Sequence, residues 1–247
     1  MADNKVMYGT SIPTAYKECL VPEIYMRLWA FGGNVFDNNF RVTMNTPQSL
    51  KAYINYKSTF KYAKPDFRTA TDISVVSDFL NGDVAMLITY PSFLSNVTDL
   101  QKISLIGEIG YNHIPGRTPI LGGWSIGISA ESKKKNDSFE FLKWTATKNN
   151  ANYFTLLGGQ PAINSIFTND ELINLYPWLP LYRAVYNYAK PILPPYRKGK
   201  SILPQDTIDS VIFQYATDLI EDRLDVSATI EKTHQKLAEL LESSVGI

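Results

Sequence analysis

An indole preceded by two glycines is the feature of this sequence best suited to hold a ligand. Gly122 and Gly123 stand directly before Trp124, and the pattern predicts a short strand over 124–129. Glycines carry no side chain, so they leave the backbone amides accessible and the indole face uncovered. An aromatic face beside free amides suits a neutral ligand with many hydroxyl groups. We predict a carbohydrate-binding cleft here; an indole buried at the end of a strand is the alternative.

A second junction of the same kind lies earlier in the chain. The apolar run 84–89 predicts a strand buried on both faces, and Pro91 ends it. Tyr90, Ser92 and Phe93 therefore fall at the carboxyl edge of a strand, where open α/β sheets place their ligands. A structural role for Tyr90 is an equally good interpretation. Trp29, just before a glycine pair, is interpreted as part of a helix core or as a further ligand contact.

The usual patterns of catalytic residues are not found. The sequence has 2 histidines, His113 and His234. His113 has no second metal-binding side chain four residues away, and His234 is predicted on the polar side of the last helix. Six carboxylates near the C-terminus follow helical spacing that spreads them over solvent-facing surfaces: Asp206, Asp209, Asp218, Glu221, Asp222 and Asp225. We therefore predict no catalytic residue, no metal site, no cofactor and no enzymatic activity. A carbohydrate-active enzyme, with two of these acids across a cleft, is the alternative.

Composition excludes several classes of partner. Lys+Arg and Asp+Glu are both 24, so no overall field attracts nucleic acid, and aromatic residues make up 13% of the 247 residues. Cys19 is the single cysteine and cannot form a disulfide within the chain. The N-terminal residues 1–5 have no apolar signal core. Either the chain is cytosolic or an export signal has been removed.

Helical periodicity and strand-like runs together predict an α/β architecture. Thr46 and Pro47 form a good helix start, whereas Pro22 predicts a break or a late start in the first helix. Asp137 is predicted to cap a helix. The expected helices are 15–31, 47–60, 75–81, 137–148, 153–157, 170–176, 179–189, 204–224 and 227–241.

Six ordered pieces of the sequence resemble a known family. They are 28–37, 79–86, 114–124, 128–142, 158–162 and 189–194, and they include the glycine pairs at 32–33, 122–123 and 158–159. In this order they are similar to the extracellular solute-binding proteins of bacterial ABC sugar importers, the group that contains maltose- and trehalose/maltose-binding proteins. The resemblance covers nearly the whole chain.

The resemblance implies a periplasmic-binding-protein-like (type II) two-lobe α/β fold. Residues 1–113 would be the first part of the C-terminal lobe, and residues 114–160 the return segment into the N-terminal lobe with its hinge crossings. Residues 161–247 would complete the C-terminal lobe with helices. The implied function is non-catalytic capture of a sugar or oligosaccharide and its delivery to the membrane subunits of an ABC permease.

The resemblance also assigns the ligand-binding residues. Tyr90 and Ser92 fall where the family places an aromatic-Pro-aromatic motif against the sugar, with Phe93 beside them. Gly122, Gly123 and Trp124 match the stacking motif, and Lys190 stands where an arginine is usual. Ser92 replaces a ring with a hydroxyl, and Lys190 lacks the two-pronged donor of arginine.

The largest departure from the family concerns the front of the chain. Family members begin with a signal peptide, often with a lipidated cysteine, followed by most of the first lobe. We therefore expect a truncated chain whose full-length form is extracellular or periplasmic and membrane-anchored. Its excursion over about 118–154 would need the missing N-terminal lobe or a second chain to cover it. A module that dimerises without any ligand is a further alternative.

Overall fold

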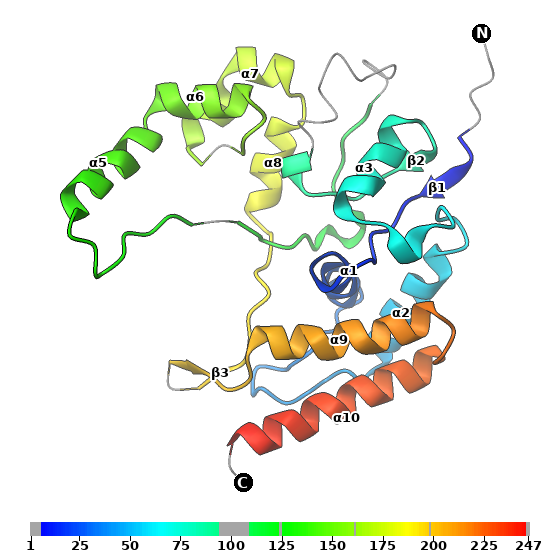
Figure 1. Cartoon of the computed structure of the whole chain (residues 1–247). Helices are drawn as coiled ribbons and strands as arrows, with labels where there is room; N and C mark the ends of the chain where they lie inside the picture. The colour runs from blue at the N-terminus through cyan, green and yellow to red at the C-terminus, as the bar shows by residue number, and fades with distance from the viewer. Residues whose placement is uncertain (1–5, 94–108, 124, 161, 198, 246–247) are drawn as a thin grey trace. The chain divides into compact units, whose positions relative to one another are not determined.

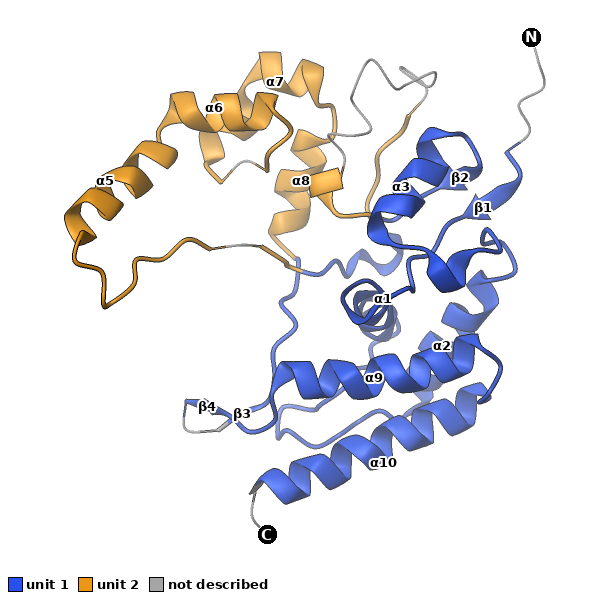
Figure 2. Cartoon of the chain, in the orientation of Figure 1, with its two compact units in different colours: residues 1–88, 114–120, 189–247 blue, residues 89–113, 121–188 orange. Residues whose placement is uncertain are grey.

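The chain consists of two compact units. A computed structural model describes residues 6–93, 109–123, 125–160, 162–197 and 199–245. Unit 1 comprises residues 1–88, 114–120 and 189–247, and unit 2 comprises residues 89–113 and 121–188 (Figure 2). The chain therefore passes between the units four times, at 88/89, 113/114, 120/121 and 188/189.

Four helices pack around one apolar core in unit 1 (Figure 1). They are α1 (Lys17–Ala30), α2 (Pro47–Thr59), α9 (Gln205–Ile220) and α10 (Val226–Val245). α1 packs against α2 and α9, and α10 packs against the same two helices, so the contacts form a closed ring. Leu28, Ile212 and Leu237 are completely buried inside it.

The boundaries of these helices follow from local sequence. The Thr46 hydroxyl accepts a hydrogen bond from the Ser49 amide, and Pro47 is the first residue of α2, as predicted. α1 ends before Gly32, whose φ is +76°. The predicted break at Pro22 is wrong, because α1 runs through it. Burial of Leu20 and Ile24 on either side stabilises the helix despite the missing amide donor.

A short parallel strand pair is the second component of unit 1. β1 (Tyr8–Thr10) pairs with β2 (Val84–Met86) in the register Tyr8 to Val84 and Thr10 to Met86. α1, α2 and α3 (Asp72–Leu80) lie between these strands in the sequence, as a parallel crossover requires. The strand predicted over 84–89 is confirmed only for Val84–Met86, and its predicted burial on both faces is wrong. Among the described residues β2 pairs only with β1, and Met86 is 67% exposed.

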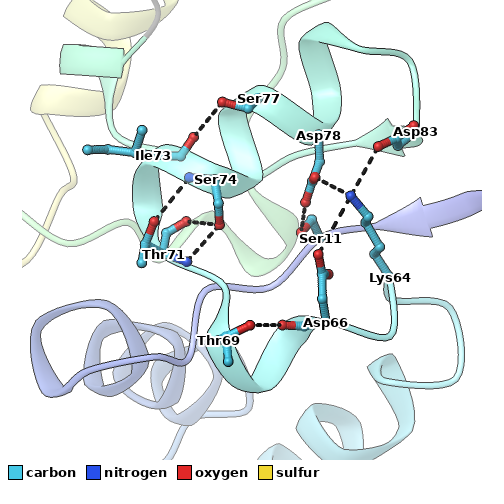
Figure 3. A network of polar contacts seen from close by, with 10 residues as sticks. All are labelled: Ser11, Lys64, Asp66, Thr69, Thr71, Ile73, Ser74, Ser77, Asp78 and Asp83. Carbon is cyan, nitrogen blue, oxygen red and sulfur yellow. Dashed lines mark hydrogen bonds and ion pairs between the residues drawn. The ribbon is translucent and has the colours of Figure 1, made fainter.

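A lysine surrounded by carboxylates joins this strand pair to α3 (Figure 3). Lys64 Nζ lies 2.5 Å from Asp78 Oδ1, 3.0 Å from Asp83 Oδ2 and 3.6 Å from Asp66 Oδ2. The Ser11 hydroxyl donates to the other oxygen of Asp78 at 2.8 Å. The hydrogen bonds that Lys64 donates to Asp78 and Asp83 raise the pKa of its ammonium group. Since Asp83 directly precedes β2, the cluster fixes the strand that leads toward Tyr90.

Unit 2 is helical among its described residues. Its elements are η2 (Pro91–Phe93), α5 (Lys135–Thr145), α6 (Lys148–Leu156), η4 (Asn164–Thr168), α7 (Asp170–Leu175) and α8 (Leu179–Tyr186). A small core forms around Trp178, Ile166 and Leu179. The remaining short elements belong to unit 1: η1 (Phe67–Thr69), η3 (Pro115–Arg117), and the antiparallel pair β3 (Tyr196–Arg197) and β4 (Lys200–Ser201).

Two local predictions for unit 2 are wrong. Residues 125–129, the described part of the strand expected over 124–129, form no strand. Ile126 is 68% exposed and finds no neighbouring strand among the described residues. α5 begins at Lys135, with Lys134 as its N-terminal cap, so Asp137 lies inside the first turn. There its negative charge interacts favourably with the helix dipole, but its side chain does not cap the helix.

Large apolar side chains lie exposed along α5 and α6. Phe139, Phe141 and Trp144 of α5 are 54%, 55% and 58% exposed. Tyr153 and Phe154 of α6 are 67% and 56% exposed. We call these five residues the aromatic face of unit 2. Within this set the rings of Phe141 and Trp144 are stacked, with centroids 5.7 Å apart. Exposed apolar side chains that lie next to one another are a feature of contact surfaces.

Candidate functional site

The two junctions predicted from the sequence meet in unit 2. A Cβ atom built on Gly122 would lie 3.9 Å from Cε1 of Tyr90, so the tyrosine ring reaches the backbone at the first glycine. Gly123 is exposed, and a Cβ atom there would meet nothing within 4 Å. A half-buried ring therefore lies beside open backbone, which provides a stacking surface and accessible amides. Trp124 lies outside the described residues.

The turn after Tyr90 holds the next two predicted residues. Pro91 opens η2, and the Phe93 amide donates to the Tyr90 carbonyl at 3.0 Å. Ser92 is exposed, whereas Phe93 is half-buried. The proline fixes the turn that ends the extended segment, so the ring and the hydroxyl have defined positions.

Lys190 belongs to unit 1 and approaches a different aromatic ring. Its amide donates to the Pro119 carbonyl at 2.9 Å, and Lys190 forms an isolated parallel bridge with Ile120. This backbone pairing directs the side chain toward α1, where Nζ lies 5.8 Å from the ring centroid of Trp29. Such a cation–π contact at a partly exposed site contributes only about 0.5–1 kcal/mol, so a ligand could displace the ammonium group.

Trp29 is held in place by the structure around the end of α1. Its Nε1 donates to Asn34 Oδ1 at 3.3 Å, and its ring lies 5.5 Å from that of Tyr25. The Thr118 hydroxyl donates to the Met26 carbonyl at 2.8 Å, which fixes η3 against this helix. The sequence suggested Trp29 as helix core or ligand contact. The structure leaves it half-buried next to an ammonium and an amide group.

A histidine–tyrosine pair lies beside two of the chain passages. The Tyr188 hydroxyl and His113 Nδ1 are hydrogen-bonded, and their rings are 5.7 Å apart. His113 directly precedes the passage at 113/114 and Tyr188 the passage at 188/189. The pair therefore ties two connecting segments of unit 2 together, which agrees with a structural role for His113.

The carboxylates near the C-terminus have structural partners. Asp206 pairs with Lys17, Asp222 with Lys57, and Arg223 with both Asp218 and Glu221. Asp209 accepts from Gln205 Nε2 at 2.7 Å, and Asp225 accepts from the Ala228 amide at 2.7 Å, which caps α10. These acids are tied to cations and helix ends in unit 1, which agrees with a structural role.

Within the described ranges no helix is both long and apolar enough to cross a membrane. In the same residues, no three His, Cys, Asp or Glu side chains come together as metal ligands would.

The sequence match now defines the class of protein. Residues 20–180 match the family described as bacterial extracellular solute-binding protein. Because this match spans more than half of the chain, the chain belongs to that family, as the resemblance implied. The family is defined by binding of a solute outside the cell and not by a reaction.

Particular relatives are distant in sequence. A Sinorhizobium fredii protein named "Probable amino-acid ABC transporter periplasmic-binding protein" is 22% identical over 191 residues, which are 76% of this chain and 44% of the relative. Maltose-bound T. maritima MalE3 is 21% identical, with a TM-score of 0.82 over 95% of this chain and 61% of that one. A solute-binding protein from Agrobacterium vitis S4 with bound D-mannitol is 18% identical, with a TM-score of 0.79 over 100% of this chain and 63% of that one.

These similarities confirm the predicted fold. The solved structures are type II periplasmic binding proteins, and this chain has the same α/β fold over the length that it shares with them. The chain spans 44% of the length of the curated relative and 61–63% of these two structures.

Proposed function

We propose that this chain carries part of the solute site of an ABC importer and captures a sugar or a polyol without chemical change. The observation that carries the proposal is the surrounding of Trp29. An aromatic ring lies there between an ammonium group, on Lys190, and an amide group, on Asn34. Sugar and polyol carbons stack on such a ring, while their hydroxyls bond the two polar groups.

Unit 2 carries a separate candidate position for a sugar, the contact between Tyr90 and Gly122. Here the ring offers another stacking surface, and Ser92 and the exposed backbone at Gly123 offer hydrogen bonds. In this proposal Phe93 supports the turn, and Trp124 adds the stacking indole that the family motif implies. The absence of an acid pair among the described residues around Trp29 and Tyr90 supports binding over hydrolysis.

The relatives suggest two solute classes, and the residues favour one of them. The Sinorhizobium relative is named for amino acids, whereas the two solved relatives hold maltose and D-mannitol. An amino acid needs partners for both an ammonium and a carboxylate group. Lys190 could meet the carboxylate, but none of the residues assigned to the proposed site carries a negative charge for the ammonium. We therefore place neutral polyhydroxyl compounds first.

Calorimetric titration with maltose, mannitol, ribitol, glutamate and leucine tests the proposal. Saturable binding of a sugar or polyol, with no response to either amino acid, is the expected result. Lys190→Ala should weaken it by about tenfold, since a hydrogen bond to a charged group contributes about 1.5 kcal/mol. Tyr90→Ala should weaken it by a similar factor through lost stacking.

Matched controls separate site effects from general ones. Lys200→Ala removes another exposed lysine of unit 1, and Tyr186→Ala removes an exposed tyrosine of unit 2 outside the proposed site, so both should leave the affinity unchanged. Binding of an amino acid alone would contradict the proposed solute class. Sugar binding that Lys190→Ala and Tyr90→Ala leave intact would contradict the proposed site.

We further propose that the aromatic face of unit 2 is covered by polypeptide of the kind that the longer relatives carry. Full burial of each large apolar side chain contributes about 1.5–3 kcal/mol, which gives the face a strong tendency to associate. Delivery of the solute to permease subunits, and anchoring of the whole protein at the membrane, are further parts of this proposal. They rest on the family resemblance.

Sedimentation velocity over a wide concentration range tests the covered face. A chain that self-associates through the face, and becomes monomeric on Phe141→Glu, would support a contact surface that lacks its natural cover. Leu193→Glu, another exposed apolar position at 65%, is the control in unit 1. A monomer that binds no hydrophobic dye would contradict the proposal.

A further inference from the structure

A groove with a volume of about 510 Å³ lies in unit 1 beside the C-terminal end of α2. Its walls come from α2, from η1, and from the turn between α9 and α10. No residue of the proposed solute site lines it. The groove is therefore a separate candidate binding surface.

The floor of the groove is apolar and partly open to solvent. The rings of Phe60 and Phe67 lie 4.5 Å apart, and Val226 and Ile220 line the same space. Ile54, on the rim, is 52% exposed. A surface of this kind accepts an aliphatic or aromatic side chain, which would leave water on binding.

The rim carries a net positive charge. Lys57, Lys61 and Arg68 line the groove together with one carboxylate, Asp222. Asp222 is already matched, since Lys57 Nζ lies 2.6 Å from its Oδ1 and holds the pKa of this carboxyl below its usual value.

The other two cations have free donor capacity. Lys61 is exposed and makes no ion pair with any described residue. Arg68 lies over the Phe67 ring, 4.8 Å from its centroid, and its Nη2 donates a 3.4 Å hydrogen bond to the Ile220 carbonyl. Its charge also helps to lower the pKa of Asp222. Most of the guanidinium donors therefore remain available to an anionic partner.

We propose that this groove binds an acidic peptide segment of a partner protein. An apolar side chain of the segment would occupy the floor between Phe60 and Phe67, and flanking carboxylates would pair with Lys61 and Arg68. The floor disfavours a small inorganic anion, which gains nothing from apolar surface. This inference does not depend on the proposed solute site.

Fluorescence anisotropy with a labelled five-residue peptide of alternating glutamate and leucine tests this inference. The matched peptide has glutamine in place of each glutamate. We expect saturable binding of the acidic peptide, weakening at high salt because the rim charges are exposed, and little binding of the glutamine peptide.

Variants of the rim locate the site. Lys61→Ala and Arg68→Gln should each weaken peptide binding by up to about fivefold, the range of exposed ion pairs, and the double variant by more than either. Ile54→Ser should weaken it by lost apolar contact. Lys51→Ala removes an exposed lysine of α2 that does not line the groove, and it should leave the affinity unchanged. Circular dichroism should show unchanged thermal unfolding for the variants compared.

Three results would overturn the inference. Equal binding of the two peptides would show that the rim charges do not recognise the peptide. Equal binding by the Lys61→Ala and Lys51→Ala variants would show that the peptide does not bind in the groove. Co-sedimentation with phosphatidylglycerol vesicles, without peptide binding, would assign the surface to a membrane instead. If inorganic phosphate does not displace the labelled acidic peptide, and the peptide binds as expected, the proposal is supported.

Discussion

The two units differ in how far they bury their own apolar residues. In unit 1 the four packed helices close around side chains such as Leu20, Ile208 and Leu237, each 0% exposed. Unit 2 has a small core around Trp178, yet it leaves the aromatic face of α5 and α6 in solvent. Both units are rich in apolar residues, so composition does not decide burial. What differs is whether partner helices within the described chain cover the apolar surface.

The largest test of this comparison removes the core of unit 2. Trp178 is 2% exposed and packs against Tyr176 and Tyr182, with ring centroids 5.7 and 6.2 Å away. Trp178→Ala should destabilise unit 2 by about 3–5 kcal/mol through the lost ring and the cavity left behind. Differential scanning calorimetry should then show unit 2 unfolding earlier while the transition of unit 1 stays in place.

The control for Trp178→Ala is Trp144→Ala on the aromatic face. Trp144 is 58% exposed, so its removal should change stability by no more than about 0.5 kcal/mol. If Trp178→Ala shifts a single transition as a whole, the two units unfold together. The view that each unit is stabilised by its own core would then be wrong.

A comparison of two separate glycines, Gly116 and Gly32, tests how tightly unit 1 is packed. Gly116 has a φ of +79°, and a Cβ atom there would lie 2.5 Å from the Cβ and 3.1 Å from the Cα of Ala30. Gly116→Ala should cost about 2–4 kcal/mol, from the left-handed backbone and the clash with α1 combined. Gly32 has a similar φ of +76° and open space, so Gly32→Ala should cost only about 1 kcal/mol. Equal urea midpoints for the two variants would contradict this packing.

A carboxylate on α9 gives unit 1 a predicted dependence on pH. Burial raises the pKa of Asp209, against the opposing hydrogen bond from Gln205. Because the folded-state pKa is the higher one, the charged form destabilises unit 1 once pH rises above the unfolded value of about 3.9. Asp209→Asn should therefore stabilise it at pH 7 by less than about 1 kcal/mol, and not at pH 3. Lower stability of the variant at pH 7 would contradict the prediction.

The reactivity of the single cysteine, Cys19, measures how often unit 1 opens. Cys19 is 2% exposed, and burial raises the pKa of its thiol to about 11. It should resist iodoacetamide at pH 8 in the native chain, react in urea, and stay protected in Trp178→Ala. Labelling followed by intact-mass spectrometry measures this. Rapid labelling of the native chain would show that unit 1 opens more easily than its packing indicates.

Local chemistry explains which elements could be predicted. The Thr46–Pro47 helix start and the glycine at position 32 act within a few residues, so sequence alone gave α2 and the end of α1 correctly. Strands need distant partners. Of the strand predicted over 84–89 only Val84–Met86 forms, and the described part of the strand predicted over 124–129 forms none. The contact of Lys190 with Trp29 is also long-range and was not predicted. The one indication of this contact in the sequence was the position of Trp29 just before the glycines that end the helix.

The four passages between the units have a consequence for synthesis on the ribosome. α1 and α2 emerge early, but α9 and α10, which cover them, lie in the last 45 or so residues of the chain. All the helices of unit 2 emerge in between. Between the emergence of α2 and that of α9 the apolar faces of α1 and α2 therefore await their partners, and unit 1 closes only after α10 has left the exit tunnel. A nascent chain that stalls before α9 should be a substrate for chaperones that bind exposed apolar helices.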